Sequence, residues 1–253
     1  MYIYNSFEEL VTIERLDKTI SKIMCISRSD ARRFIKIGKV FVNGEKMKAF
    51  DTKISESDEI VVDGEKLSLE KNVYIVMNKA AGIVCDDKSS APYAIDTLPK
   101  ELKRKDLFCV GRLDKDTTGL LLITNDGEFS HSVISPKKHI EKRYRATLQN
   151  PITENDIAKA KQGITLKDGT KLLPSEMFAV TADNKTVDFV IFEGKYHQIK
   201  RMAGALDNKI LSLHRYQIGE LVLPKDLDFG EAKKVEKEQA FLVFEKAKNW
   251  QKD

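Results

Sequence analysis

The stretch GRLDKDTTGLLLITNDG, residues 111–127, constrains the fold of this chain more than any other segment. Apolar runs at residues 108–110 and 120–124 flank it, and both are typical of buried strands. Asp114 therefore falls on a loop between two core strands, and Gly111 allows the backbone to turn into that loop. Two interpretations stay open from these residues alone. Asp114 closes an Asx turn, or it is a carboxylate positioned for chemistry.

The order of motifs in this stretch, GRLD, a Thr three residues later, GLLL and TNDG, resembles the active-site motif of the pseudouridine synthases. The match is closest to the RsuA-like branch, which contains the ribosomal small-subunit enzymes. Because it runs over the whole 17-residue stretch, it is far more specific than a short glycine motif. The resemblance implies that Asp114 is the catalytic aspartate.

The composition sets broad limits on the protein. The 253 residues are 42% apolar and 32% charged, which is typical of a soluble globular protein. The formal net charge of +4 is too small to indicate nucleic-acid binding, so such a surface has to come from local clusters. The three cysteines form no CxxC pair, which favours a reducing compartment, and we expect a cytoplasmic protein.

Several classes of protein are excluded at this stage. No apolar run reaches membrane-spanning length, and the first residues do not resemble a secretory signal. The four histidines show none of the spacings of a metal site, so we expect no bound metal. The resemblance likewise implies that no organic cofactor is needed.

A short basic helix is predicted over residues 27–38, with Ser27 as its N-cap and Gly38 at its end. Four cations fall on one arc of this helix, and a fifth, Arg33, lies further round. The four are Arg28, Arg32, Lys36 and Lys39. Only Asp30 lies nearby in the sequence to neutralise them. The arc is either a solvated charged face or a surface for a phosphate backbone.

The sequence around this helix, RLDK…SRSDARRFIKIGKVFVNG…DEIVVDG, resembles the S4 RNA-binding domain from Arg15 to about Gly64. We therefore expect four parts: an N-terminal extension at 1–13, an S4-like domain at 14–65, a linker at 66–71 and a catalytic domain at 72–253. The expected fold class is α+β. A small S4-like α/β domain precedes a larger, mainly antiparallel mixed sheet with flanking helices, as the resemblance implies.

Two further motifs precede and follow the Asp114 loop. Lys79-Ala-Ala-Gly82 occupies the place of the family's Lys-Pro-x-Gly motif, with Ala80 in place of proline. Lys79 either approaches RNA or closes a structural ion pair. The EKRYRA segment matches the family's EKxYxA motif, which implies that Tyr144 lies beside the target base. Its ordinary alternative is a strand tyrosine that packs its ring. Arg143 and Arg145 would point to the opposite face of that strand.

The last motif, EGKYHQIK, resembles the family's EGxxHQI followed by a basic residue. The resemblance implies that Lys200 pairs with the catalytic carboxylate, and a cation about 4 Å away would keep that carboxylate ionised. Without the resemblance, Lys200 is a helix-face lysine, and His197 and Gln198 form a local cap. Arg201 contacts phosphate or takes the pairing role instead.

These motifs predict an enzyme that isomerises a specific uridine to pseudouridine in ribosomal RNA, in 16S rRNA of the small subunit. The expected catalytic residues are Asp114, Tyr144 and Lys200. The expected RNA contacts are Arg28, Arg32, Arg33, Lys36, Lys39, Lys79, Arg112, Arg143, His197 and Arg201. We expect a monomer that binds ribosomal RNA or a ribosome assembly intermediate. The alternatives are a large-subunit enzyme of the same branch and a non-catalytic assembly factor.

Overall fold

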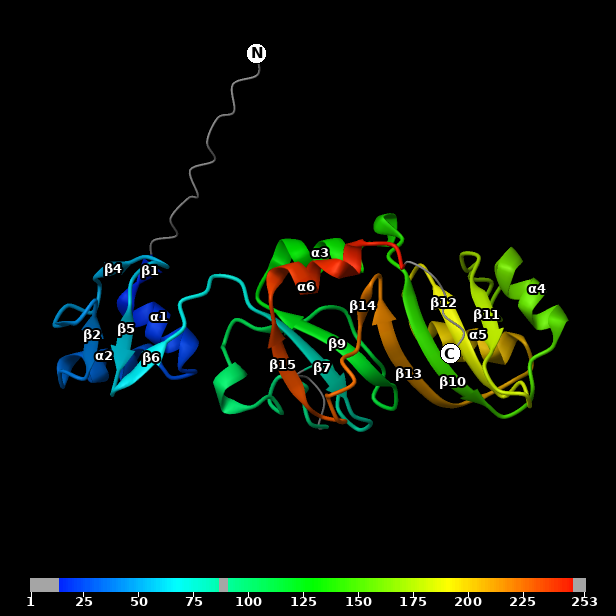
Figure 1. Ribbon diagram of the computed structural model, residues 1–253, viewed down its shortest axis with the longest axis horizontal. Coiled ribbons are helices and arrows are strands. Elements are labelled where there is room, and N and C mark those ends of the chain that lie inside the picture. Colours follow the sequence, from blue (N-terminus) through cyan, green and yellow to red (C-terminus); the bar gives the residue numbers. More distant parts are fainter. Residues whose placement is uncertain (1–13, 87–90, 248–253) are drawn as a thin grey trace, which may run out of the picture. The chain divides into compact units, whose positions relative to one another are not determined.

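The computed structural model describes residues 14–86 and 91–247, which form two compact units (Figure 1). The N-terminal unit contains the chain up to Asn72 together with Lys103–Asp106, and the C-terminal unit contains Val73–Leu102 and the chain from Leu107 onward. The predicted extension at 1–13 lies outside the described residues.

The N-terminal unit combines two helices with short strands. A four-stranded antiparallel sheet has the order β3-β2-β5-β6, and β1 pairs with β4. The elements are β1 Glu14–Arg15, α1 Leu16–Ile23, α2 Arg28–Lys36, β2 Val40–Val42, β3 Glu45–Lys46, β4 Lys53–Ile54, β5 Ile60–Val62 and β6 Glu65–Leu67. Strand β6 occupies part of the stretch predicted as a linker, because Lys66 and Leu67 pair with β5.

The basic helix forms where the sequence predicts it. The Ser27 hydroxyl accepts a hydrogen bond from the Asp30 amide at 3.0 Å, which caps the start of α2. Ala31 and Ile35 bury the apolar side of α2 against Leu16 and Ile20 of α1. The opposite side of the helix, with its cations, is left exposed.

The C-terminal unit contains most of the chain. Its strands are β7 Tyr74–Lys79, β8 Phe108–Cys109, β9 Thr118–Thr124, β10 Lys142–Leu148, β11 Glu176–Ala179, β12 Thr186–Ile191, β13 Ile210–Ile218, β14 Leu221–Val222 and β15 Ala232–Val235. Its helices are α3 Gly127–Ile134, α4 Glu154–Gln162, α5 Gln198–Ala205 and α6 Lys237–Phe241. Short 3₁₀ turns occur at Lys100–Leu102, Pro136–Lys138 and Leu242–Phe244.

The nine described strands of this unit form one sheet, with β11-β12-β10-β13-β9-β7-β15 along its main path. Neighbouring strands are antiparallel except β13 and β9, which run parallel over two residue pairs, His214 with Thr118 and Arg215 with Gly119. Two antiparallel halves thus meet at one short parallel contact. The mainly antiparallel mixed sheet predicted from the sequence is confirmed.

Both faces of the sheet are covered, which explains why the strands flanking Asp114 are apolar without alternation. Along β9, Leu121 and Ile123 enter one core, whereas Leu120 and Leu122 enter the other. Figure 1 shows α3 and α6 together over the β7–β9 part of the sheet, where the rings of Phe129 and Phe241 lie 5.2 Å apart. Helices α4 and α5 contribute to the core on the other face.

Gly119 is the residue that allows β9 and β13 to approach. Its φ is +103°, and a Cβ added there would lie 2.2 Å from the Arg215 carbonyl oxygen. The obstacle is backbone, so no side chain can move aside to make room.

We expect Gly119→Ala to lower the free energy of unfolding by roughly 2–4 kcal/mol, because it combines backbone strain with overpacking. Denaturant unfolding followed by circular dichroism measures the change. Gly127→Ala is the matched control, since no atom lies within 4 Å of the added methyl group at the start of α3. Equal stability of both variants would show that the parallel contact tolerates a side chain.

Candidate active site

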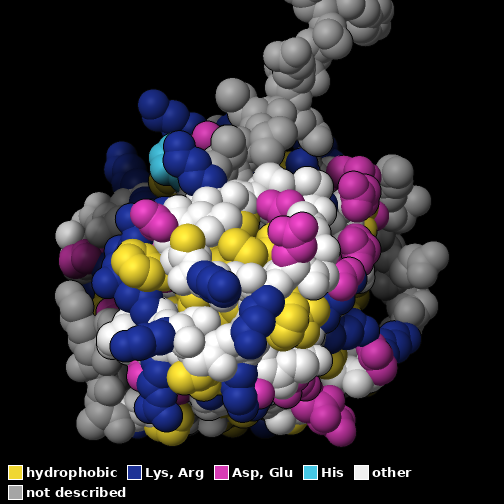
Figure 2. All heavy atoms as spheres, turned by 90° about the vertical axis from the view of Figure 1, so that its left-hand side faces the viewer, with side chains coloured by type: hydrophobic (Ala, Val, Ile, Leu, Met, Phe, Trp, Pro, Cys, Tyr) yellow, Lys and Arg dark blue, Asp and Glu magenta, His cyan; other side chains and the backbone are white. Residues whose placement is uncertain are grey.

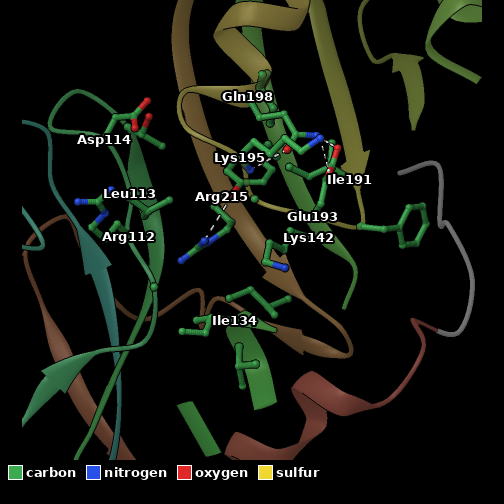
Figure 3. A pocket seen from close by; sticks show the side chains of 18 of the residues that line it. Arg112, Leu113, Asp114, Ile134, Lys142, Ile191, Glu193, Lys195, Gln198 and Arg215 are labelled. Carbon is green, nitrogen blue, oxygen red and sulfur yellow. Dashed lines mark hydrogen bonds and ion pairs between the residues drawn. The ribbon is translucent and has the colours of Figure 1, made fainter. Parts of the chain in front are cut away.

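A pocket of about 140 Å³ opens in the C-terminal unit where the Asp114 loop, β10, β13 and the start of α5 meet (Figure 3). Asp114 and Tyr144 both line it, although 30 residues separate them in the sequence. By the 10–15 Å³ that one water needs, the space holds roughly ten waters. It is therefore large enough for one small planar ring.

The Asp114 loop is held by the turn that follows β7. The Thr117 amide donates to the Asp114 carbonyl at 3.1 Å, which closes a turn inside the loop. The Gly82 amide donates to the Lys115 carbonyl at 2.8 Å, and the Leu113 amide lies 3.4 Å from Cys85 Sγ. Backbone contacts on both sides of Asp114 therefore fix the position of its carboxylate.

Lys79 has a role that differs from both sequence-based expectations. Its side chain is completely buried, and its Nζ donates to the carbonyls of Ala80 and Ile83 at 3.0 and 2.8 Å. A longer contact of 3.4 Å reaches the Lys115 carbonyl. Burial lowers the pKa of Lys79. The ammonium group ties the 80–83 turn to the Asp114 loop, and it forms no ion pair with another described residue.

The Asp114 carboxylate lies in a cluster of charges at the pocket. Lys200 Nζ is 2.9 Å from Asp114 Oδ2 and 2.5 Å from Asp116 Oδ1, so one ammonium group bridges two carboxylates. The hydrogen bond from Lys200 lowers the pKa of Asp116. Burial alone would lower the pKa of Lys200, but its hydrogen bonds to Asp116 and Asp114 raise it instead. Asp116 and Lys200 are thus both charged at neutral pH.

His197 lies on the other side of the same carboxylate. Its Nε2 is 3.4 Å from Asp114 Oδ1, and its ring stacks on Tyr196 at 3.8 Å. The backbone of His197 is left-handed and its side chain makes no cap hydrogen bond. Gln198 instead accepts from the Lys195 amide and donates to the buried Glu193. The turn before α5 is therefore built by Gln198, which leaves His197 beside Asp114.

Tyr144 lies on β10 directly opposite Arg215 on β13. The register shifts between Arg143 and Tyr144, and such bulges are frequent beside active sites. Tyr144 is 8% exposed, and its hydroxyl accepts from Arg215 Nη1 at 3.4 Å. The ring therefore forms a wall of the pocket with its hydroxyl directed at a cation.

The other predicted RNA contacts of this unit, Arg112, Arg143 and Arg201, differ in exposure, and each lies within 4 Å of a carboxylate. Arg112 is exposed at the pocket, 3.9 Å from Asp86. Arg201 pairs with Asp168 and not with Asp114, so the alternative assignment of the pairing role to Arg201 is wrong. Arg143 pairs with Glu141 and is 11% exposed, which leaves little of its guanidinium for RNA.

The predicted basic arc of the N-terminal unit surrounds a carboxylate that is distant from it in the sequence. Asp17 of α1 is fully buried and accepts hydrogen bonds from Arg15, Arg28 and Arg32. Burial would raise the pKa of Asp17, but the three guanidinium groups lower it far below its usual value. Three arginines on one carboxylate leave a net positive surface.

The other predicted cations of this unit are Lys36 and Lys39 of the arc and Arg33 beside it. Lys39 pairs with Asp63 at 2.6 Å. Arg33 and Lys36 are exposed, and neither forms an ion pair with another described residue. On the face of this unit seen in Figure 2, Lys and Arg side chains surround exposed hydrophobic ones. Exposed Ile37, Phe41 and Phe50 belong to the same unit.

Sequence reasoning missed two residues of the site, Asp116, which pairs with Lys200, and Arg215, which lines the pocket. Asp116 lies two positions after Asp114, and only the fold shows that both reach Lys200. Arg215 shares a strand face with Leu213, and this period-two pattern could have placed it on the buried side.

Two kinds of site are not observed in the described part of the chain. Over residues 14–86 and 91–247, no three His, Cys, Asp or Glu side chains are placed to hold a metal ion together. In the same residues, no helix is both long enough and apolar enough to cross a membrane.

Comparisons with known proteins agree with the two units. Residues 73–205 match the RNA pseudouridylate synthase family, and residues 14–60 match the S4 domain. Ribosomal small subunit pseudouridine synthase A of Haemophilus influenzae is 42% identical over 86% of this chain and 94% of its own. The Vibrio vulnificus protein of that name is 38% identical over 91% of this chain and 99% of its own. A pseudouridylate synthase crystal structure aligns with TM-score 0.64 and 38% identity, covering 90% of this chain and 99% of the other.

Proposed function

The chain belongs to the RNA pseudouridylate synthase family, and we propose that it isomerises one uridine of small-subunit (16S) ribosomal RNA to pseudouridine. The observation that carries the proposal is the Asp114–Lys200 ion pair at a ring-sized pocket walled by Tyr144. The names of the similar small-subunit enzymes support the choice of RNA.

The reaction explains why such a pocket is needed. Pseudouridine forms when the N1–C1′ bond breaks, the detached ring turns, and C5 bonds to C1′. A base in an RNA helix cannot turn in place, so the nucleotide must be flipped into a protein pocket. The pocket must hold the free ring, because loss of the ring would leave an abasic site.

Asp114 is the group that acts at the sugar. As an ionised carboxylate it attacks C1′ as a nucleophile, or it removes a proton from C2′ as a general base. Lys200 lies 2.9 Å from this carboxylate and orients it in the pocket. Because Asp116 shares the ammonium group, the carboxylate–lysine cluster keeps one surplus negative charge.

Tyr144 is the group that acts at the base. Its ring offers a flat face to the uracil, and its hydroxyl is a candidate acceptor for the C5 proton. Arg215 donates to this hydroxyl at 3.4 Å and so fixes its direction.

The N-terminal unit supplies a surface for the RNA. An S4 domain with exposed Arg33 and Lys36 fits phosphate contacts, which give affinity and register but no chemistry. We infer that the protein acts in the cytoplasm, as a monomer, on ribosomal RNA or an assembly intermediate. A large-subunit enzyme of the same branch and a non-catalytic assembly factor are the alternatives.

Asp114→Asn should reduce turnover at least about a thousandfold, because it removes the reacting charge at constant size. RNA binding should stay within about twofold of wild type. The assay uses transcripts with tritium at C5 of uridine, since C5 loses its hydrogen when it bonds to C1′. Parallel 16S and 23S transcripts separate the two subunit assignments.

Asp226→Asn is the matched control, because Asp226 is exposed, pairs with Lys233 and does not line the pocket. An Asp114→Asn variant with more than a tenth of wild-type kcat, a loss below about 1.4 kcal/mol, would remove Asp114 from the mechanism. Wild type that releases no tritium from either transcript would favour the non-catalytic factor.

Lys200→Ala should lower kcat more than Lys200→Arg, because arginine keeps the charge beside Asp114. The charged cluster persists between the lowered pKa of Asp116 and the raised pKa of Lys200. The contribution of this cluster to wild-type kcat is therefore lost as the pH falls through the pKa of Asp116, and it is lost again as the pH rises through the pKa of Lys200. A pH profile of all three proteins tests this. Equal kcat for alanine, arginine and wild type would exclude the ion-pair role.

The double reversal Arg33→Glu with Lys36→Glu should weaken RNA binding and reduce the slope of log Kd against log salt. The expected reduction is roughly 0.7–0.9 for each phosphate that the protein no longer neutralises. These two cations are chosen because they pair with no described carboxylate, whereas Arg32 holds buried Asp17. Turnover at saturating RNA should change little.

Lys159→Glu with Lys161→Glu on α4 makes the same change in net charge away from the basic helix and serves as the control. If both double variants weaken binding equally, the effect is one of overall charge, and the basic helix has no special part in RNA binding.

A further inference from the structure

Arg215 is a buried cation that the Asp114 chemistry does not use. Its side chain is 4% exposed and lines the pocket. Its Nε donates to the Leu120 carbonyl at 2.9 Å and its Nη1 contacts the Tyr144 hydroxyl, but its Nη2 has no partner. Among the described residues, no carboxylate lies within ion-pair distance of this guanidinium. The buried charge therefore has no carboxylate partner among the described residues, although it is one of the cations that lower the pKa of Cys85.

Lys142 adds a second cation to the same pocket. It precedes Tyr144 by two positions on β10, and its Nζ donates to the Ile140 carbonyl at 3.0 Å. Burial and the nearby charge of Arg215 lower its pKa to about 8. Figure 3 shows Arg215 and Lys142 near each other, with the Asp114 loop across the pocket. Both donate only to neutral oxygens, so the pocket contains uncompensated positive charge.

A second polar atom of the pocket, besides Arg215 Nη2, also lacks a partner. Thr117 is buried, and its hydroxyl has no hydrogen-bond partner. Only three buried side-chain polar atoms in residues 14–86 and 91–247 lack a partner, and two of them, on Thr117 and Arg215, belong to this pocket. Buried polar groups normally find partners in a folded protein. Their concentration in one cavity indicates that a bound molecule supplies the missing partners.

The shape and chemistry of the pocket indicate what that molecule is. Tyr144 offers a flat wall, and Leu113, Ile199 and Leu213 add apolar surface. The polar groups near Tyr144 include two donors, Arg215 and Lys142, and the Thr117 hydroxyl, which can donate or accept. The carboxylates of Asp114 and Glu193 also line the pocket, and Glu193 already accepts from Gln198 and from the Leu173 amide. A uracil ring has apolar faces and an edge with two carbonyl acceptors and one N–H donor. It therefore complements both parts of this lining.

We propose that Arg215, assisted by Lys142, contacts the carbonyl oxygens of the flipped uracil and stabilises the negative charge that the ring acquires when its bond to C1′ breaks. This inference rests on the function proposed above. It adds a catalytic contact at the base to the role of Asp114 at the sugar.

The charges balance in the proposed step. The electron pair of the N1–C1′ bond leaves with the ring and spreads from N1 onto O2 and O4. The electron-deficient C1′ is compensated by a bond to the Asp114 carboxylate or by transfer of the C2′ proton to it. The ring then turns, and C5 donates an electron pair to C1′. On the first route this displaces the Asp114 carboxylate from C1′, and on the second Asp114 returns the proton to C2′. The C5 proton passes to solvent, and N1 takes up a proton. Cations beside O2 and O4 stabilise the ring most while it is detached, which is when stabilisation accelerates the reaction.

A backbone phosphate fits these cations less well than the uracil does. Nη2 of Arg215 is shielded from solvent in a pocket with apolar walls, whereas a phosphate carries a ribose on either side and a hydration shell. Arg112, which is exposed at the same pocket, is better placed for a phosphate. Phosphate binding by Arg215 would lower RNA affinity on substitution and leave the rate of the bound complex unchanged.

The test compares uridine with 5-fluorouridine at the target position of a 16S transcript. Fluorine withdraws electrons, so the detached ring is a more stable anion and needs less help from the protein. Arg215→Met should lower the single-turnover rate on uridine by roughly a hundredfold at saturating RNA, as expected for loss of a donor to developing charge. The defect on 5-fluorouridine should be at least about threefold smaller. Chromatography with mass spectrometry of nuclease digests follows the disappearance of each substrate nucleoside, because C5 of 5-fluorouridine has no proton to lose and its product differs from pseudouridine.

Further variants keep the test informative if Arg215→Met folds poorly. Lys142→Met removes a single side-chain hydrogen bond, the one to the Ile140 carbonyl. Its rate defect should be smaller than that of Arg215→Met, and it should likewise be larger on uridine than on 5-fluorouridine. Arg215→Lys keeps the charge and should recover part of the rate. Lys161→Met, on the exposed side of α4, is the matched control and should react like wild type on both substrates. Thermal unfolding of each variant separates loss of fold from loss of rate.

Two results would overturn the inference. Equal defects of Arg215→Met and Lys142→Met on uridine and 5-fluorouridine would exclude stabilisation of the leaving ring. An unchanged single-turnover rate with weaker RNA binding would assign Arg215 to a phosphate. Failure of the proposed function is distinct from both, because wild type would then convert no uridine in 16S RNA.

Discussion

The short parallel contact between β9 and β13 is the constraint on which the rest of the C-terminal unit depends. It joins two antiparallel halves of the sheet, and it requires Gly119 because the Arg215 carbonyl fills the space of a side chain. Asp114 precedes β9 in one half, whereas Tyr144 belongs to the other. The pocket forms where β9 of one half lies beside β13 of the other, and the two strands approach closely because residue 119 is a glycine.

The pocket separates two kinds of charge that the reaction needs at different atoms. Asp114 and Asp116 share Lys200, so the part that we propose faces the sugar holds two carboxylates and one ammonium group. Arg215 and Lys142 donate to neutral oxygens in the part that we propose faces the base. Rupture of a glycosidic bond makes the sugar electron-deficient and the base electron-rich. The polarity of the empty pocket already corresponds to that of the breaking bond.

The sequence predicted those features that lie in continuous motifs. The helix capped by Ser27, the strands around Asp114 and the mainly antiparallel sheet follow from local patterns. The residues that it missed act across long separations. Asp17 is recognised as a partner of Arg28 and Arg32 only when α1 packs on α2. Lys79 was expected at a surface or in an ion pair, because burial of an ammonium among backbone carbonyls leaves no pattern in the sequence.

Asp17 also affects how much side-chain entropy the N-terminal unit loses when it binds RNA. Arg15, Arg28 and Arg32 are already oriented by one carboxylate, and the Arg32 guanidinium lies 4.7 Å from the Phe50 ring centroid. A free arginine side chain loses up to about 2 kcal/mol of rotamer entropy when it is fixed. For these arginines much of that loss occurs during folding. The N-terminal unit therefore meets its partner with side chains that are rigid beforehand, and association demands little further ordering.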